Sequence, residues 1–287
     1  MMAADTLLMG AVAYDPKVVT IWDGFRAWFR DQDLDFDYVL YSNYERQVEE
    51  LVAGRIHAAW NSPLAWVRAR RLAATSGIEI AAVAMRDTDQ DLTSIVVTRD
   101  NTGIASVDDL RGRTVAVGAI DSPQATLIPL ALLRAAGLEP GHDFEVRRFD
   151  IGVGLHGDHI GRERDAARAL VAGQVDAACM IDSNHLAFTK EGTLPAGTIV
   201  VAQTDRYDHC NMTVVPEAAP ARAIDRFAHL LLSMSYHDAS VRPLLDLEGL
   251  KQWQPGRLDG YEQLERAVDA FGFYDSAGTV TSDAYRP

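Results

Sequence analysis

A short segment that occurs twice in this chain limits the folds that it can adopt. Residues 51–60 read LVAGRIHAAW, and residues 170–179 read LVAGQVDAAC. Each copy follows a charged run with helical spacing, YERQVEE before the first and RERDAAR before the second. Because glycine readily takes the left-handed conformation that ends a helix, each copy predicts a helix that leads into a short apolar strand. Two such units half a chain apart predict two similar α/β lobes with a ligand cleft between them.

The rest of the chain alternates apolar strands with helices. Strands are predicted at residues 7–13, 36–41, 56–60, 78–85 and 94–98. With the helices between them, they indicate a mainly parallel sheet that is covered by helices on both faces. A second α/β unit follows, so we predict a lobe of residues 99–203 inserted between residues 1–98 and 204–287 of the other lobe. The chain would then cross between the lobes twice, near Thr98 and Thr204, and two crossings make a hinge.

Charge and hydropathy exclude several classes of partner. The 287 residues carry a net charge of −14, with 41 acidic and 27 basic residues and no Lys/Arg-rich run, so nucleic acid is not an expected partner. No apolar run reaches the length that spans a membrane, so no membrane insertion is expected. The sequence starts without the pattern of a signal peptide, which predicts a cytoplasmic protein. A periplasmic or cell-surface location is the alternative if a leader was trimmed.

Two clusters of histidine and cysteine stand out. The first is His156-Gly-Asp-His159, and the second is Asp208-His209-Cys210, just after the second predicted crossing. If both clusters face the cleft, His156, His159, His209 and Cys210 supply imidazole and thiolate ligands for zinc or another first-row transition metal. The same residues also fit capping groups, hydrogen-bonding partners of a ligand or plain surface residues, because HxDH is not a strong zinc motif.

These residues also raise the alternative of a cytoplasmic, metal-dependent enzyme on the two-lobed scaffold. The candidate catalytic residues are His159, Glu163 and Cys210, with Glu163 as a general base or a metal ligand. A nucleophilic Cys210 would need a nearby base or cation. His209 is expected to be a poor partner for Cys210, because adjacent residues in a strand point to opposite faces.

Four segments of the chain resemble a known family. They are NYERQVEELVAGRIHAAWNSPLAWVRA (43–69), TSIVVTRDNTGIASVDDLRGRTVAVG (93–118), SPQATLIPLALLRAAGL (122–138) and ARALVAGQVDAACMIDSN (167–184). The chain resembles the type II periplasmic-binding-protein superfamily and, within it, the phosphonate- or phosphite-binding components of ABC transporters. The resemblance implies two lobes that close by a hinge on a small, usually anionic ligand, and an ABC permease as the partner if the protein is exported.

The resemblance also implies which residues line the pocket. The predicted ligand-binding residues are Tyr14, Tyr44, Asn61, Ser62, Thr93, Ser94, Ser122, Gln124, Thr126, Glu163 and Asp182. Three departures argue against a phosphonate ligand. Leu92 stands where the family has a tyrosine, Pro123 removes a backbone donor at the helix start, and Glu163 replaces a histidine with an acid. We therefore expect a solute-binding protein whose ligand is cationic or rich in hydroxyls, or an anion that is held through a metal.

Overall fold

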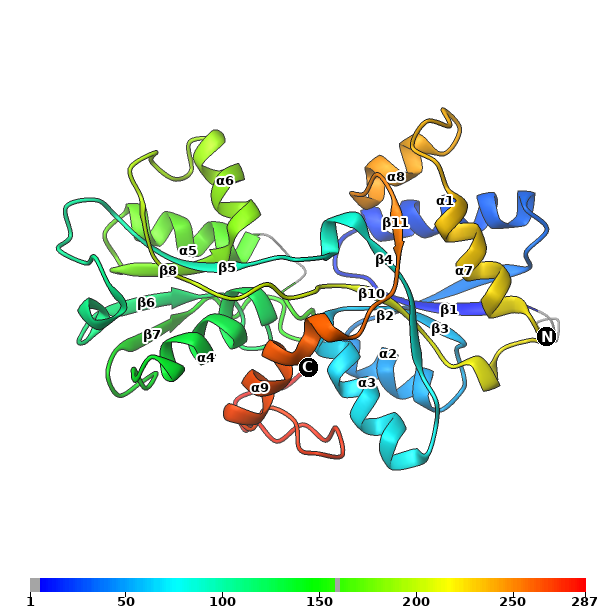
Figure 1. Ribbon diagram of the computed structural model, residues 1–287, viewed down its shortest axis with the longest axis horizontal. Helices are drawn as coiled ribbons and strands as arrows, with labels where there is room; N and C mark the ends of the chain where they lie inside the picture. The colour runs from blue at the N-terminus through cyan, green and yellow to red at the C-terminus, as the bar shows by residue number, and fades with distance from the viewer. Residues whose placement is uncertain (1–5, 158–160) are drawn as a thin grey trace.

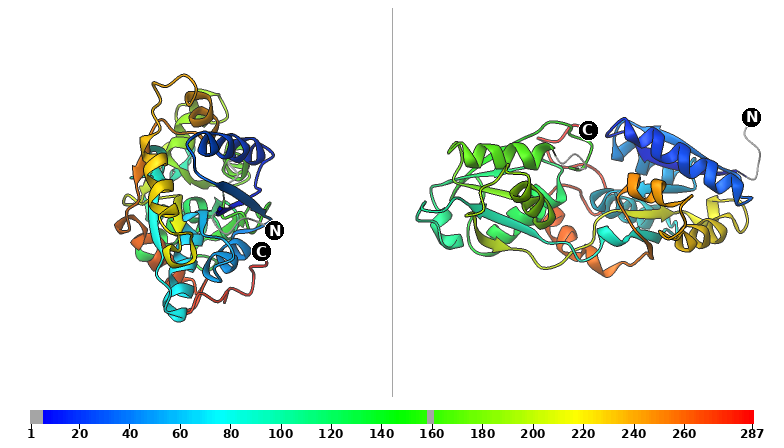
Figure 2. Two further views of the ribbon diagram at one scale, coloured as in Figure 1. Left: turned by 90° about the vertical axis from the view of Figure 1, so that its right-hand side faces the viewer. Right: turned by 90° about the horizontal axis from the view of Figure 1, so that it is seen from above.

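Two β-sheets, each with its own helices, form the two lobes of an elongated molecule (Figure 1). The computed structural model describes residues 6–157 and 161–287. Seen from above, the lobes lie end to end with connecting backbone between them (Figure 2). The predicted two-lobed α/β architecture is confirmed. Across residues 6–157 and 161–287, no helix combines the length and the apolar character needed to cross a bilayer.

The first sheet has the strand order β11-β4-β10-β3-β1-β2. Its strands are β1 (Leu7–Val12), β2 (Phe36–Tyr41), β3 (Ala58–Asn61), β4 (Ala81–Arg86), β10 (Asn211–Val214) and β11 (Trp253–Pro255). Its helices are α1 (Lys17–Asp31), α2 (Tyr44–Val52), α3 (Pro63–Ser76), α7 (Ala223–Ser233) and α8 (Arg242–Glu248). Helices α1, α7 and α8 lie on one side of the sheet, and α2 and α3 on the other (Figure 1).

The second sheet has the strand order β7-β6-β8-β5-β9. Its strands are β5 (Ser94–Thr98), β6 (Thr114–Val117), β7 (Glu145–Arg148), β8 (Ala177–Ile181) and β9 (Ile199–Gln203). Helices α5 (Gly161–Val171) and α6 (Asp182–Lys190) cover one face, while α4 (Ile128–Ala135) covers the other and is preceded by a π-helical turn, Pro123–Leu127. The remaining short helices are 3₁₀ turns at Asp87–Asp89, Val107–Leu110, Pro216–Ala218 and Asp259–Tyr261.

Each sheet mixes parallel and antiparallel pairs, which refines the expectation of mainly parallel sheets. Strands β1, β2 and β3 are parallel, as are β6, β7 and β8, but β5 and β10 run antiparallel to both of their neighbours. These two strands directly follow the two passages of the chain between the sheets. Strand β5 was predicted to end the first lobe, and it lies in the second sheet instead. The first passage therefore runs through residues 87–93, ahead of the predicted boundary at Thr98.

The two crossing segments pair with each other between the lobes. Leu92 and Tyr207 form an antiparallel bridge, with each backbone N–H donating to the other residue's carbonyl, at 2.8 and 2.9 Å. Helix α9 (Glu262–Ala270) and the C-terminal segment that follows it also lie between the lobes (Figure 1). Tyr274 and Tyr285 of that segment are buried, so the C-terminal end of the chain is part of the inter-lobe structure.

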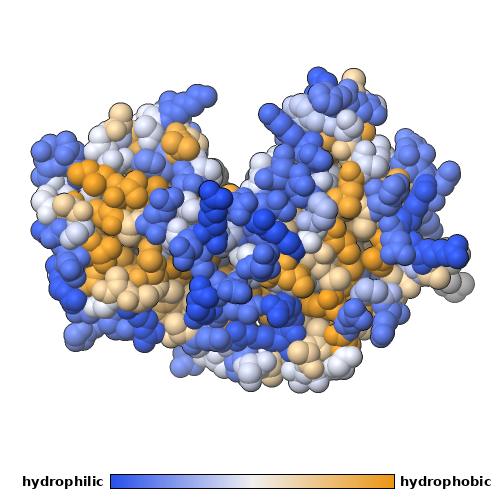
Figure 3. Space-filling view, viewed as in Figure 1, coloured by the Kyte–Doolittle hydropathy of each residue, from blue (hydrophilic) through white to orange (hydrophobic). Residues whose placement is uncertain are grey.

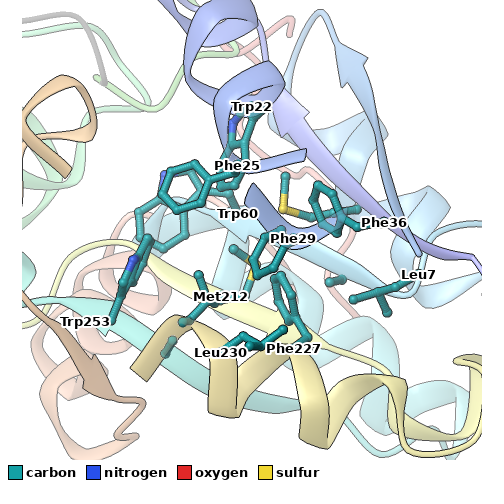
Figure 4. Packing of buried hydrophobic residues seen from close by; sticks show 14 of the residues in the cluster. Leu7, Trp22, Phe25, Phe29, Phe36, Trp60, Met212, Phe227, Leu230 and Trp253 are labelled. Atoms are coloured by element: carbon teal, nitrogen blue, oxygen red, sulfur yellow. The ribbon is translucent and has the colours of Figure 1, made fainter. Parts of the chain in front are cut away.

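An aromatic cluster fixes the strand ends of the first lobe. Helix α1 buries its apolar side, including Phe25 and Phe29, as its helical spacing predicts. Phe29 contacts Phe36 and Phe227, with ring centroids 4.7 and 5.2 Å apart, and Phe25 contacts Trp253 at 6.0 Å (Figure 4). The cluster thus joins α1, the sheet and α7. Through Trp253 it also contacts Trp60 of β3, with ring centroids 5.5 Å apart.

Candidate functional site

A cavity of about 390 Å³ opens between the two lobes. The molecular surface is hollowed at this position (Figure 3). The first-lobe side and the crossing segments contribute Tyr14, Asp15, Lys17, Trp60, Arg86, Thr88, Asp89, Leu92, His209 and Cys210, and the second-lobe side contributes Gln124, Gly157, Glu163, Ile181, Ser183 and Asn184. A ligand in this cleft would therefore contact both lobes, as in proteins that close on their ligand by a hinge.

A buried ion pair forms the first-lobe wall. Arg86, the last residue of β4, donates to both carboxylate oxygens of Asp89 at 2.5 and 2.9 Å. The guanidinium also reaches Glu248 and lies 5.3 Å from the centre of the Trp60 ring. Burial alone would raise the pKa of Asp89, but the charge of Arg86 and the hydrogen bonds from His209 and Arg86 outweigh it and lower the pKa to about 2. Asp89 therefore presents an ionised carboxylate beneath the cleft.

Asp89 meets two residues from the second crossing segment. The Nδ1 atom of His209 lies 3.1 Å from the Cys210 Sγ atom and 3.5 Å from Oδ1 of Asp89. All three residues are buried. The prediction that His209 and Cys210 would point to opposite faces is wrong, because β10 begins only at Asn211 and the preceding backbone is irregular. The neighbouring side chains can therefore turn to the same side.

The second-lobe wall presents an amide and a carboxyl group. Oε2 of Glu163 accepts hydrogen bonds from the Ile181 backbone N–H at 3.0 Å and from the Asn184 amide at 2.8 Å. Burial raises the pKa of Glu163, and these hydrogen bonds offset only part of the rise. Gln124, in the π-helical turn, donates through Nε2 to the Gly157 carbonyl at 2.9 Å, and its Oε1 lies 3.4 Å from His209 Nε2.

His156 lies in a second cluster, separate from His209 and Cys210. Its Nδ1 is 2.6 Å from the Ser62 hydroxyl, and its Nε2 is 2.9 Å from Oε1 of Glu45. The ring stacks on Tyr44, with centroids 4.7 Å apart. The predicted metal set of four ligands is therefore not assembled around His156, because both nitrogens of its fully buried ring face this other cluster. His159 lies outside the described residues.

The C-terminal segment completes the cluster around His156. The Tyr274 hydroxyl donates to Oε1 of Glu45 at 2.8 Å, and the Tyr285 hydroxyl is 3.4 Å from His156 Nε2. Burial would raise the pKa of Glu45, but attraction to His156 and the hydrogen bonds from His156 and the tyrosines lower it to about 2. Asp121 accepts from the backbone N–H of His156 at 3.1 Å, and burial raises its pKa. Glu45, Tyr44 and Ser62 belong to the first lobe, so His156 ties the lobes together.

The loop that carries His156 depends on glycine. His156 itself has a φ of 49°, and Gly157 has a φ of 75°. A Cβ atom on Gly157 would lie 2.4 Å from the Ser122 hydroxyl oxygen. The close approach and the positive φ explain the glycine at position 157, which lets the backbone turn sharply against Ser122 at the start of the π-helical turn.

Most of the other predicted pocket residues do not line the cavity, and they form hydrogen bonds within the protein. Asn61 bonds Gln47 and Thr213, Thr93 donates to Asp182 at 2.9 Å, and Ser94 bonds Tyr207 and the Gln124 carbonyl. Ser122 caps the π-helical turn, and Thr126 is buried within it, where its hydroxyl group finds no hydrogen-bond partner among the described residues. Of the predicted ligand-binding residues, the cleft is lined by Tyr14, Gln124 and Glu163. Arg86, Asp89 and Asn184 were missed. For Arg86 and Asp89 the available signal was a charged segment directly after a predicted strand.

Comparisons with known proteins identify the family of the chain and show the same two-lobed fold. A family model described as the periplasmic substrate-binding protein of phosphonate ABC transporters matches residues 11–261. The PhnD1 structure from Prochlorococcus marinus with methylphosphonate superposes with a TM-score of 0.69 at 17% identity, over 94% of this chain and 99% of that chain. The binding component of a phosphonate ABC transporter from Pseudomonas aeruginosa gives 0.62 at 12% identity, over 92% and 86%. The aliphatic sulphonate binding protein SsuA from Escherichia coli gives 0.57 at 18% identity, over 94% and 92%.

Proposed function

This chain belongs to the family of periplasmic phosphonate-binding components of ABC transporters, and from this premise we propose that its ligand is a small polar solute other than a simple phosphonate. The protein is a solute-binding protein that holds its ligand between two hinged lobes. Its family implies an ABC permease as partner. The family is periplasmic, so we place the chain in the periplasm rather than in the cytoplasm, where the sequence alone had placed it.

The composition of the cleft walls carries the proposal. The ionised Asp89 faces the cleft from one side, and the buried carboxyl of Glu163 faces it from the other. Trp60 adds an aromatic surface, while the guanidinium of Arg86 is engaged by Asp89 and Glu248. Three carboxyl groups, those of Asp15, Asp89 and Glu163, line the cavity together with two cationic side chains, Lys17 and Arg86, so acidic groups outnumber basic ones. The acidic groups favour a solute that donates hydrogen bonds, such as an amine or a polyol, with an apolar part against the indole.

The hydroxyl groups that would hold a phosphonate are turned away from the cavity. Ser94 and Ser122 satisfy internal partners, and His156 covers Tyr44 and Ser62. A phosphonate dianion in the remaining space would lie near the charge of Asp89, and like charges at short range repel each other. The position that the resemblance assigned to the ligand is thus filled by the chain itself, and the cavity lies beside it.

A ligand screen tests this proposal. We expect the midpoint temperature of thermal unfolding to rise when members of a panel of amines, amino alcohols and polyols are added. Methylphosphonate should leave it unchanged. At a ligand concentration about 100 times the Kd, binding adds about 2.7 kcal/mol to the free energy of unfolding. Quenching of tryptophan fluorescence gives a second measurement, because Trp60 lines the cavity.

A matched pair of variants locates the binding. Glu163→Gln is expected to weaken the best hit at least tenfold, because the carboxyl group loses an acceptor oxygen. Asp165→Asn, on the same helix but paired with Arg168 outside the cavity, serves as control. Tight binding of methylphosphonate, or equal ligand affinity in both variants, would reject the proposed ligand class.

A further inference from the structure

We propose that Asp89, His209 and Cys210 form a binding site for zinc or a similar first-row transition metal in the first-lobe wall of the cleft. The proposal rests on these three side chains and is tested without solute, but a bound metal would neutralise Asp89, so the solute screen described above applies to the metal-free protein. Of the four metal ligands predicted from sequence it retains His209 and Cys210, leaves out His156, which lies in the other cluster, and His159, which lies outside the described residues, and adds Asp89.

The three donor atoms converge on one point. The His209 Nδ1 atom is 3.1 Å from the thiol sulfur and 3.5 Å from the Asp89 Oδ1 atom, and all three atoms lie within 4.8 Å of one another. Tetrahedral zinc with bonds of about 2.0–2.3 Å places its ligand atoms roughly 3.3–3.8 Å apart. Small side-chain rotations would therefore bring the three atoms to coordination distance.

The far side of the His209 ring is arranged as in a metal site. Its Nε2 faces Oε1 of Gln124 at 3.4 Å. The amide orientation of Gln124 is set by its other end, which donates to the Gly157 carbonyl at 2.9 Å. Oε1 can therefore accept from Nε2–H, and in that tautomer the Nδ1 lone pair faces Cys210 and Asp89 and is available to a metal. Histidine ligands of metals commonly donate their second N–H to a fixed acceptor in this way.

The same geometry argues against a catalytic triad. In a triad, the imidazole contacts the nucleophile through one nitrogen and the carboxylate through the other, so a proton can pass between them. Here a single nitrogen, Nδ1, faces both Cys210 and Asp89. A metal ion placed between these three atoms could bind all of them at once. Proton transfer through the ring would instead need Cys210 and Asp89 on different nitrogens.

The local charge balance favours a divalent cation. Asp89 and Glu248 both contact Arg86, so these three side chains together carry a formal charge of −1 before any thiolate forms. Ionisation of Cys210 on metal binding makes this −2, which a divalent cation neutralises. The mixed sulfur, nitrogen and oxygen donor set selects zinc, cobalt, nickel or copper over calcium or magnesium. Since all three ligands line the cavity, the fourth coordination position opens to the cleft.

Titration with Co²⁺ tests the site directly. Protein prepared without a polyhistidine tag, and freed of metal by a chelator, is expected to bind about one equivalent with the visible bands of tetrahedral cobalt. A near-ultraviolet thiolate-to-cobalt charge-transfer band should appear as well, and Zn²⁺ should abolish both signals. Because no solute is added, the outcome does not depend on the solute proposed above.

Variants identify the ligands. Cys210→Ser should remove the charge-transfer band, and Asp89→Asn should weaken cobalt binding at least tenfold. Gln124→Leu, which removes the acceptor behind His209, should weaken it by about 10–100-fold. Cys179→Ala is the control and should keep the band, since burial raises the pKa of that core thiol to about 12. Circular dichroism checks that each variant is folded.

Two results would overturn the metal site. One is the absence of a charge-transfer band in the wild-type protein at saturating Co²⁺. The other is cobalt affinity that is unchanged in folded Cys210→Ser. If the Cys210→Ser variant fails to fold, the rate at which Cys210 is alkylated in the wild-type protein is measured instead. Zn²⁺ should slow this alkylation, and an unchanged rate would count against the site.

Discussion

Replacing His156 with alanine is expected to lower the free energy of unfolding by about 3–5 kcal/mol, because removal of one partner leaves a buried charge uncompensated. That charge is Glu45, whose carboxylate is held ionised by His156 and by hydroxyl donors from the C-terminal segment. The variant also loses the stacked contact with Tyr44 and the bond to Ser62. Because these contacts join the two lobes, we also expect the lobes to separate on average.

Two measurements check this expectation. Denaturant unfolding reports the loss of free energy, and small-angle X-ray scattering reports a larger radius of gyration for the variant. His142→Ala is a suitable control, since that side chain is 82% exposed and should change stability by less than about 0.5 kcal/mol. A loss for His156→Ala no larger than that of the control, with an unchanged radius of gyration, would show that the lobes are held by other contacts.

The fold could be predicted because its signals are local. Apolar strands and helical spacing along α1, together with the repeated helix-glycine-strand units, each depend on neighbouring residues alone. These patterns define two α/β lobes without any knowledge of which strands are neighbours. Strand β5 was assigned to the wrong lobe because its sequence reads as an ordinary buried strand, and only pairing with β8 and β9 decides its sheet.

The site was harder to predict because its contacts are long-range. His156 contacts Glu45 and Tyr285, which are 111 and 129 residues away in sequence, and no local sequence pattern predicts either contact. The pocket positions implied by the resemblance, such as Ser62, were therefore expected to face a ligand when they face His156 instead. His209 and Cys210 were singled out by residue type and by their position after the second predicted crossing, whereas the charged segment that contains Asp89 does not by itself distinguish a site residue from a surface residue.

Replacing Arg86 with methionine is expected to cost about 3–5 kcal/mol of unfolding free energy at neutral pH, because it leaves two buried carboxylates without their shared countercharge. Asp89 and Glu248 are 2% and 3% exposed, and both bond the guanidinium. Arg55→Met is the matched control. Arg55 also pairs with a carboxylate, that of Glu50, but its side chain is 57% exposed, so its loss should cost at most about 1 kcal/mol.

The pH dependence separates this explanation from a simple packing defect. In the wild-type protein, Arg86 and, to a lesser extent, His209 overcome burial and lower the pKa of Asp89 from 3.8 to about 2, so these interactions stabilise the fold above the unfolded pKa, and this contribution is lost as the pH falls through about 2. Without Arg86, burial raises the pKa of Asp89, so its ionised form destabilises the variant at neutral pH and protonation relieves the penalty. The stability difference between the two proteins should therefore be largest at neutral pH and should shrink as the pH falls from about 5 to about 3. Unfolding free energies measured across this range test the sign, and a constant difference would assign the loss to packing.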